Sequence, residues 1–276
     1  MVKIGNIDKS LNPLALGCWT FGGAQWGGQD DTQSVEAMER ALELGMNHFD
    51  TASGYGNGHS ERMVGSFLKG RRDKIFLASK QGAKPTKAEY RQSIELSLKN
   101  LQTNHIDLYY IHWPRTGMDM RPTMEALIEA KEQGKIGAIG VSNFSITHMN
   151  EVSEIGPIDA HQLCYNLFWR WDEKDIIPYC EEHDIAVVSY SSIAQGILTG
   201  KFPESPVFKE GDQRPSTTLF DKNVWPLIFT AVEEMKITAE EVNRSLTHLA
   251  IRWVKSRRFI NSVLVGVRDR AQVDDN

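Results

Sequence analysis

The chain lacks the features that define several protein classes. It has 3 cysteines in 276 residues, an odd number at wide spacing, which argues against a disulfide framework and favours a reducing compartment. No apolar run approaches the roughly 20 residues of a membrane span, and the first residues do not form the apolar core of a secretory signal. We therefore expect a cytoplasmic protein with no membrane partner.

The chain also lacks an excess of charge of one sign and the usual cofactor and metal motifs. The net charge of −5 with only short basic clusters gives no reason to expect nucleic acid as a partner. No Cys/His cluster has zinc-ligand spacing, so no metal site is predicted. Gly54, Gly56 and Gly58 do not have the spacing of a G-x-G-x-x-G motif, so a Rossmann domain is not indicated.

The chain does contain seven short apolar runs that mostly end in polar residues, with helical spacing between most of them. These runs are 46–50, 74–80, 107–112, 136–143, 158–162, 185–190 and 260–266. Buried parallel strands have this character, and a first strand is expected at Leu14–Gly17 after a short hairpin over residues 2–10. The pattern predicts an α/β fold, a single (β/α)8 TIM barrel domain over residues 1–276.

Helices are expected over 32–44, 59–69, 87–101, 122–133, 146–155, 173–183 and 239–256. The irregular stretch 200–222 is long enough to be a mobile functional loop. The eighth outer helix should begin near Ala271, only a few residues before Asn276, so we expect it to be incomplete and the native chain to continue.

Four polar residues near the ends of consecutive predicted strands suggest an active site: Asp50, Tyr55, Lys80 and His112. A lysine buried at a strand end needs a countercharge, which Asp50 can supply. A nearby ammonium favours the phenolate, so we expect Lys80 to lower the pKa of Tyr55 toward neutrality and make it a general acid. Each residue alone fits a plain structural role, but the four together fit protonation of an oxygen that is becoming an alkoxide.

These residues lie in motifs that resemble those of the aldo-keto reductase family. The matching segments are 49–56, 78–80, 107–114, 135–144 and 190–201, in the family's order along the whole chain. The sequences of these segments are closer to those of bacterial-type members and potassium-channel β-subunit relatives than to those of aldose reductases. The resemblance implies an NADPH-linked carbonyl reductase in which Tyr55 is the proton donor, Lys80 and Asp50 tune it, and His112 orients the carbonyl.

The resemblance also implies a cofactor site. Ser142, Asn143 and Gln162 would hold the nicotinamide carboxamide, and Tyr190 would stack on its ring. The segment after Tyr190 would run beside the pyrophosphate, and the segment after strand eight would bind the 2′-phosphate and adenine. The further cofactor-binding residues expected on these segments are Ser191, Ile193, Gln195, Gly266, Arg268, Gln272 and Asn276.

Arg268 makes NADP(H) the expected cofactor rather than NAD(H), because a guanidinium matches phosphate geometry. This chain departs from the family pattern at the adenine end, because many family members have arginine at the position of Gln272 and glutamate at the position of Asp275.

Five tryptophans fall in predicted strand-to-helix loops on the face of the barrel that carries the tetrad: Trp19, Trp26, Trp113, Trp169 and Trp171. Pockets are lined mostly by apolar and aromatic groups, so Trp19, Trp26 and Trp113, with Tyr55 and His112, are expected to bind a small carbonyl or alcohol substrate.

The first hypothesis is therefore an NAD(P)H-dependent oxidoreductase that reduces an aldehyde or ketone, or acts in reverse on a sugar or polyol. One alternative is a lyase that uses Lys80 as a Schiff-base nucleophile, although a charged lysine is a poor nucleophile. The other is a non-catalytic, cofactor-sensing regulatory subunit. The physiological substrate and the oligomeric state are left open.

Overall fold

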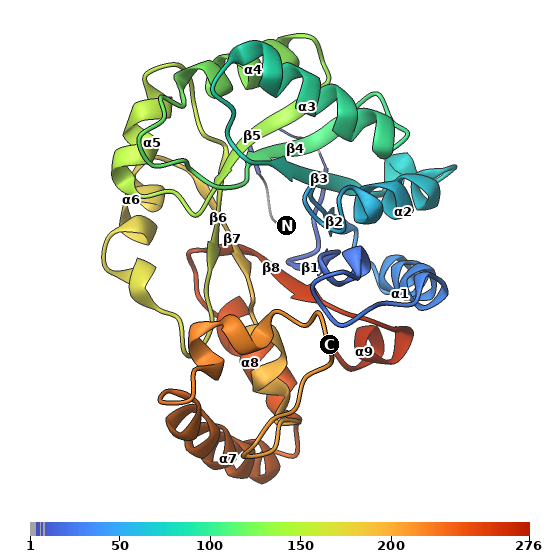
Figure 1. The fold of residues 1–276 in the computed structure, drawn as a ribbon, viewed down its shortest axis with the longest axis vertical. Coiled ribbons are helices and arrows are strands. Elements are labelled where there is room, and N and C mark those ends of the chain that lie inside the picture. Colours follow the sequence, from blue (N-terminus) through green and yellow to red (C-terminus); the bar gives the residue numbers. More distant parts are fainter. Residues whose placement is uncertain (1–3, 6, 8) are drawn as a thin grey trace.

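The computed structural model describes residues 4, 5, 7 and 9–276, and its centre is a closed barrel of eight parallel strands (Figure 1). The strands are β1 (Leu14–Gly17), β2 (His48–Asp50), β3 (Phe76–Gln81), β4 (Ile106–Ile111), β5 (Ile136–Ser142), β6 (Ala160–Cys164), β7 (Ala186–Tyr190) and β8 (Ile260–Gly266). Strand β8 pairs with β1 and closes the ring. The fold is a (β/α)8 TIM barrel, as predicted, and β1 has the predicted bounds.

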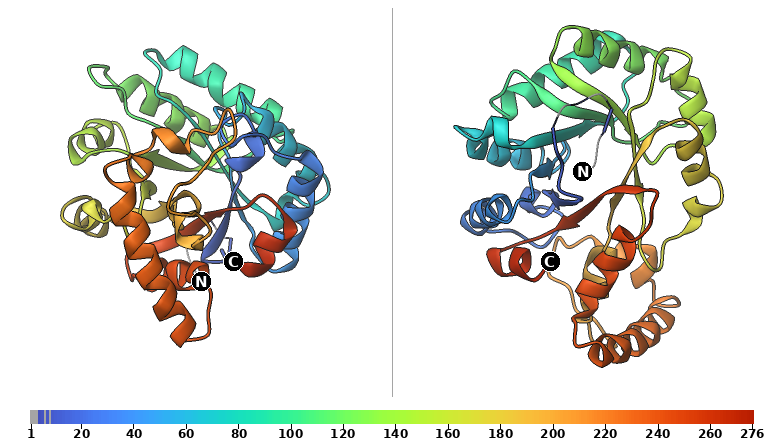
Figure 2. Two further views of the ribbon diagram at one scale, coloured as in Figure 1. Left: turned by 60° about the horizontal axis from the view of Figure 1, so that its bottom comes forward. Right: turned by 180° about the vertical axis from the view of Figure 1, so that it is seen from behind.

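Helices surround the barrel (Figures 1 and 2). They are α1 (Asp31–Glu43), α2 (His59–Leu68), α3 (Lys87–Asn100), α4 (Arg121–Glu132), α5 (Ile146–Ser153), α6 (Ile176–Glu182), α7 (Trp225–Glu241), α8 (Leu246–Lys255) and α9 (Arg270–Asp275). Helix α1 shows why such segments are helical. The Asp30 side chain caps its first turn, and Ala37, Met38 and Ala41 bury one face.

One helix prediction was wrong. We expected a continuous helix over 239–256, but α7 ends at Glu241 and α8 begins at Leu246. Asn243 has a left-handed backbone with φ of 52°, and the Ser245 side chain accepts a hydrogen bond from the His248 N–H, so a new helix begins there. Helix α7 itself was not predicted. It lies outside α8, away from the barrel (Figure 1).

The interior of the barrel is mostly apolar, apart from polar residues toward the carboxyl ends of its strands and the buried pair His48 and Ser262. Phe76, Tyr110 and Leu264 belong to the interior core. A Cβ atom at Gly140 would lie 2.2 Å from a carbon of the Tyr110 ring, so glycine at this position makes room for that side chain. The polar interior residues Asp50 and Lys80 are therefore held in a closely packed environment.

Three other expectations concern the ends of the chain and its long loop. The hairpin over 2–10 falls partly on residues outside the described set and stays a prediction. The helix after β8 begins at Arg270, close to the expected position. The stretch 200–222 is irregular apart from short 3-10 turns at Arg214–Ser216 and Thr218–Phe220.

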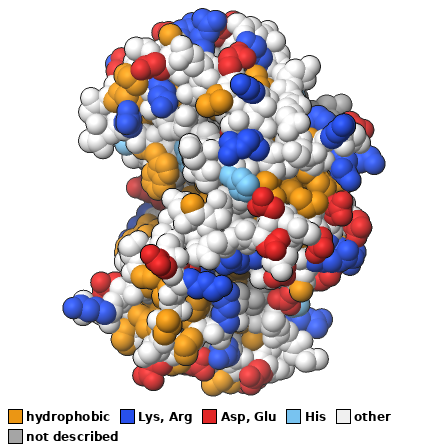
Figure 3. Space-filling model, turned by 45° about the vertical axis from the view of Figure 1, so that its right-hand side comes forward, with side chains coloured by type: hydrophobic (Ala, Val, Ile, Leu, Met, Phe, Trp, Pro, Cys, Tyr) orange, Lys and Arg blue, Asp and Glu red, His pale blue; other side chains and the backbone are white. Residues whose placement is uncertain are grey.

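The surface carries acidic and basic side chains interspersed on the face that Figure 3 presents. Among the described residues we find no helix with the length and apolar character that crossing a membrane would require.

Candidate active site

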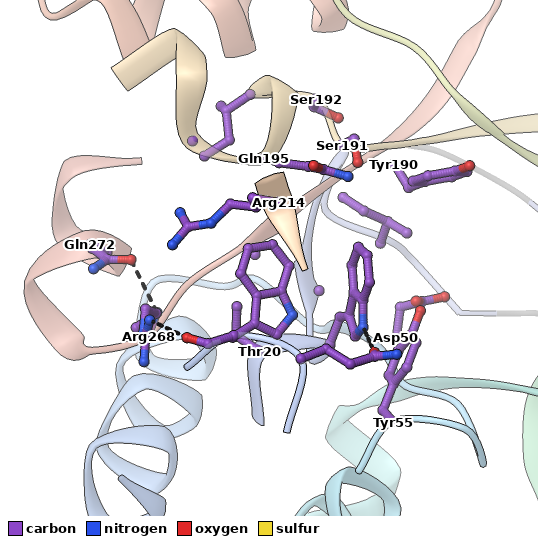
Figure 4. Close-up of a pocket in the computed structure, with 18 of the residues that line it drawn as sticks. Thr20, Asp50, Tyr55, Tyr190, Ser191, Ser192, Gln195, Arg214, Arg268 and Gln272 are labelled. Carbon is purple, nitrogen blue, oxygen red and sulfur yellow. Dashed lines mark hydrogen bonds between the residues drawn. The ribbon is translucent and has the colours of Figure 1, made fainter. Parts of the chain in front are cut away.

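The carboxyl ends of the strands open into a cavity of about 630 Å³. Figure 4 shows Asp50 and Tyr55 at one end of it and Arg268 and Gln272 at the other, with Tyr190 on the opposite wall. All the residues expected to bind cofactor or substrate line this cavity, as do Asp50 and the catalytic candidates Tyr55 and His112. Lys80 is not on the cavity wall.

Lys80 is fully buried, and its ammonium group donates three hydrogen bonds. Its Nζ atom donates to Asp50 Oδ1 at 2.5 Å, to the Thr51 carbonyl at 2.8 Å and to Tyr55 Oη at 3.2 Å. Burial opposes the charged form, but Asp50 and Tyr55 outweigh it and raise the pKa of Lys80. The amine is therefore protonated near neutral pH and has no free hydrogen or lone pair for nucleophilic attack.

Tyr55 lies between Lys80 and the cavity. Its ring stacks on Trp19, with centroids 5.9 Å apart, and lies edge-on to His112 at 5.7 Å. Burial raises the pKa of Tyr55, and the lowering effect of Lys80 does not overcome it. The expectation that Tyr55 is tuned toward neutrality was therefore wrong, because desolvation of the phenolate was left out. The hydroxyl keeps its proton at neutral pH and can give it to a bound oxygen.

His112 is a neutral hydrogen-bonding group in this structure. Burial, followed by the charge of Lys80, lowers its pKa to about 3. A neutral imidazole has one N–H donor. It can therefore orient a carbonyl oxygen near Tyr55 without supplying the proton itself.

Close contact between two loops fixes the position of Tyr55. Gly56 has φ of 57°, and a Cβ atom there would lie 2.2 Å from the Gly22 carbonyl oxygen. A Cβ atom at Gly22 would in turn lie 2.6 Å from the Gly56 nitrogen. The loops after β1 and β2 thus meet backbone to backbone, which only glycine permits, and this contact places Tyr55 beside Trp19.

The amide side chains form the floor of the cavity. Gln162 Nε2 donates a hydrogen bond to Asp50 Oδ2 at 2.9 Å. The other carboxylate oxygen of Asp50, Oδ1, accepts the hydrogen bond from Lys80. Tyr190 Oη donates to Asn143 Oδ1 at 2.7 Å, and Asn143 Nδ2 donates to the His112 carbonyl at 3.2 Å. Ser142 Oγ accepts from Asn143 Nδ2 at 3.0 Å. Strands β4 to β7 therefore bring amide and hydroxyl side chains together at the centre.

The Arg268 side chain, at the other end of the cavity, forms hydrogen bonds with other residues of the protein. Its guanidinium donates to the Trp26 carbonyl at 3.1 Å, to Gln29 Oε1 at 3.0 Å and to the Gly28 carbonyl. The predicted phosphate ligand thus holds the loop after β1. Gln272 Oε1 accepts from the Arg268 backbone N–H at 3.1 Å.

Two cations on the cavity wall were missed from the sequence: Lys201 and Arg214. Burial, then Arg214 and Arg268, lower the pKa of Lys201. Arg214 is largely buried and pairs with Asp212 at 2.5 Å. Lys201 ends the 190–201 motif and could have been found there, whereas nothing in the irregular sequence around Arg214 predicts that it turns inward.

The donor set fits a nicotinamide dinucleotide. Amides and a hydroxyl at the centre match a carboxamide, the Tyr190 ring offers a flat platform, and cations at the far end match phosphates.

The chain belongs to the aldo/keto reductase family, whose model matches residues 13–276. It is 36% identical over 284 aligned residues to the aldo-keto reductase YhdN of Bacillus subtilis, covering 99% of this chain and 86% of that protein. It is 28% identical to the NADH-specific methylglyoxal reductase of Escherichia coli, covering 100% of this chain and 91% of that one.

Solved structures show the same relationship. The chain superimposes on the glycerol dehydrogenase AKR11B4 of Gluconobacter oxydans with a TM-score of 0.90 and 35% identity, covering 99% of this chain and 88% of that one. An aldo-keto reductase from Klebsiella pneumoniae, solved in complex with NADPH, gives a TM-score of 0.78 and 25% identity, covering 100% and 87%. The fold and family are thus those of oxidoreductases that use nicotinamide cofactors.

Proposed function

We propose that this protein reduces an aldehyde or ketone to an alcohol with NAD(P)H, or catalyses the reverse reaction on a sugar or polyol. The observation that carries the proposal is the contact between Lys80 Nζ and Tyr55 Oη. Because the ammonium donates to the phenol oxygen, the phenolic hydrogen is left to point elsewhere. The cavity that Tyr55 lines is where a carbonyl oxygen can receive it.

Each residue of the tetrad has a separate task in this proposal. A bound nicotinamide would supply the hydride to the carbonyl carbon. Tyr55 gives its proton to the oxygen as the carbonyl becomes an alcohol, and the charge of Lys80 stabilises the tyrosinate left behind. Asp50 keeps Lys80 charged, and neutral His112 holds the oxygen with its N–H.

The cofactor would lie along the cavity from Gln162 to Gln272. Ser142, Asn143 and Gln162 would hold its carboxamide and Tyr190 would support its ring. Its phosphates would lie near Ser191, Ile193, Gln195 and Gly266, with Lys201 and Arg214 as countercharges, and Gln272 and Asn276 would contact the adenosine. We propose NADPH over NADH because Arg268 lines the cavity together with Gln272 and Asn276, which would contact the adenosine, although the Escherichia coli relative is NADH-specific.

The geometry does not support a Schiff-base lyase, because Lys80 is charged and its three hydrogens are used. We propose that residues 1–276 act as one barrel domain in the cytoplasm, with small carbonyl or alcohol compounds as substrates bound by Trp19, Trp26 and Trp113. The Trp19 and Trp26 rings pack edge to face at 5.0 Å beside Tyr55, which suits an apolar substrate wall.

The test is a cofactor-oxidation screen over aldehydes, ketones, sugars and polyols with NADPH and NADH. We expect steady oxidation of at least one cofactor with simple aldehydes. Tight cofactor binding without turnover of any compound would instead indicate the cofactor-sensing regulatory subunit.

A further inference from the structure

A second cavity, of about 820 Å³, lies beside the main one and is not used by the proposed chemistry. Its walls come from the loops after β4 to β7 and from residues 216–219. We call it the side cavity. The two cavities share a wall, which is formed by Trp113, Asn143, Tyr190, Ser191 and Gln195.

Aromatic side chains dominate one part of the side cavity. Trp113, Phe144, Trp169 and Trp171 all line it, and the Trp113 and Trp171 side chains are 54% and 66% exposed. The Trp113 ring centroid lies 6.4 Å from that of His112, which joins this cavity to the reaction centre. Exposed indole faces attract organic cations. Lys174 also lines the side cavity and its Nζ lies 5.9 Å from the Trp171 ring, so a ligand cation would use the Trp113 and Trp169 faces.

The side cavity also contains an unpaired carboxylate. Within the described part of the chain, the Asp172 side chain has no hydrogen-bond or ion-pair partner, although it is only partly exposed. Asp175, also on the wall, is different because its side chain accepts a hydrogen bond from the Ile176 N–H at 2.7 Å. Burial and the charge of Asp175 raise the pKa of Asp172 to about 6, so it is mostly ionised at neutral pH.

Asp172 lines the side cavity together with Cys164 and with Tyr190, which belongs to the wall shared by the two cavities. A partly buried charge without a partner is costly, and a cationic ligand would offset that cost.

We infer that the side cavity is the distal part of the substrate site and that it selects carbonyl compounds bearing an ammonium group. The inference rests on the proposed function, since it assigns a substrate class to the same active site. Asp172 would pair with the cation and the tryptophan faces would surround it, while the carbonyl reaches Tyr55 and His112.

Two aldehydes of the same shape provide the test, because they differ only in charge. These are 4-(trimethylammonio)butanal and the neutral 5,5-dimethylhexanal. We expect the parent protein to prefer the cation by about tenfold or more in kcat/KM. Asp172→Asn should lower this ratio about tenfold, a loss of the size expected for one desolvated charge contact. The control Glu182→Gln removes one exposed carboxylate outside the cavity and should keep the ratio.

A binding measurement covers the case in which Asp172→Asn does not fold well. Tetramethylammonium chloride should change the tryptophan fluorescence of the parent protein saturably, whereas sodium chloride at equal concentration should not. Turnover of the neutral aldehyde with no preference for the cation, or with the same preference in Asp172→Asn, would overturn this inference alone. If neither aldehyde nor any simple aldehyde is reduced, the proposed function fails as well.

Discussion

The two ends of the main cavity are built differently. At the reaction end, Asp50 and Lys80 lie on strands, are almost fully buried and form a hydrogen-bonded ion pair. At the adenosine end, Arg214 pairs with Asp212 of its own loop, and Arg268 bonds to the loop after β1. Strands fix the first set in place, whereas the second set would have to exchange hydrogen-bond partners to bind the phosphate that we propose for it. The reaction end therefore depends on burial and the adenosine end on competition between hydrogen bonds.

The largest effect is expected at the reaction end, from Tyr55→Phe. The change removes the phenolic proton that Tyr55 would give to the nascent alkoxide and leaves Lys80 and the amides in position. Loss of one general acid costs about 10²–10⁴-fold in rate, so kcat should fall by that amount. The dissociation constant of the cofactor, measured by fluorescence, should stay within a few-fold. Activity close to that of the parent would contradict the role of Tyr55.

A second prediction concerns buried histidines near the reaction end. His161 Nε2 accepts a hydrogen bond from the Phe144 N–H at 3.2 Å, next to Asn143. Burial lowers the pKa values of His48 and His161 to about 4, below the ordinary 6.5. Between pH 6.5 and 4 the unfolded chain thus binds protons that the folded chain does not, so the free energy of unfolding should fall as the pH falls.

The size of this effect follows from the shift, since one pKa unit corresponds to about 1.4 kcal/mol. Each histidine should lower the free energy of unfolding by roughly 3 kcal/mol at pH 4 on that scale. Urea unfolding from pH 7 to pH 4.5 measures it. Carboxylates also titrate there, so His161→Gln, whose amide oxygen can still accept from Phe144, is the matched variant. Equal pH slopes for parent and variant would contradict the prediction.

The same contrast explains what could be read from the sequence. Asp50, Lys80 and His112 follow apolar runs, so strand periodicity located them. Arg214 and Asp172 lie in short 3-10 turns, where the sequence has no hydrophobic periodicity that would predict which side chains turn inward. The break between α7 and α8 was missed because Val242 continues the apolar spacing, yet it is 53% exposed beside the left-handed Asn243. The raised pKa of Tyr55 depends on burial, which a list of neighbouring charges does not contain.

A third prediction tests whether the loop contact positions Tyr55. Gly56→Ala puts a Cβ atom within 2.2 Å of the Gly22 carbonyl oxygen and at positive φ. Such a clash costs about 1–3 kcal/mol, so the free energy of unfolding should fall by that amount, and kcat should fall as Tyr55 moves. Gly82→Ala is the control, because its Cβ would meet nothing within 4 Å. If both variants are equally stable and active, the contact does not constrain Tyr55.

A smaller effect is expected at the adenosine end, on the choice of cofactor. If Arg268 exchanges its bonds to Trp26 and Gln29 for a 2′-phosphate, Arg268→Ala should weaken NADPH about tenfold relative to NADH, the size of one charge-assisted hydrogen bond. Dissociation constants for both cofactors measure this. Arg270→Ala, which removes an exposed arginine near Glu43, is the control. An unchanged ratio in Arg268→Ala together with a lowered one in Arg214→Ala would assign the phosphate to Arg214.

The smallest effect is expected in the long loop of residues 200–222, which we predict to be more mobile without cofactor than with it. Part of this loop is already held to the loop after β1. The backbones of Asp212 and Trp26 form an isolated antiparallel β-bridge, and the Gln213 N–H donates a hydrogen bond to the Gln25 carbonyl at 3.1 Å. In the preceding part Phe208 packs on Phe220, with ring centroids 4.9 Å apart, but the neighbouring Val207 is 93% exposed and Lys209 is exposed as well. We therefore expect mobility to concentrate before Asp212.

Limited trypsin digestion can test this, because Lys209 lies in the exposed part. Loops over barrel sites commonly close on a ligand, and Lys201 and Arg214 flank this one on the cavity wall. NADPH should therefore slow cleavage after Lys209 by a few-fold. Cleavage after Lys69, between α2 and β3 and not on the cavity wall, should keep its rate and serves as the internal control. Equal rates at Lys209 with and without cofactor would mean that the bridge at Asp212 already holds the loop closed, so that at this end only hydrogen-bond partners change when a ligand binds.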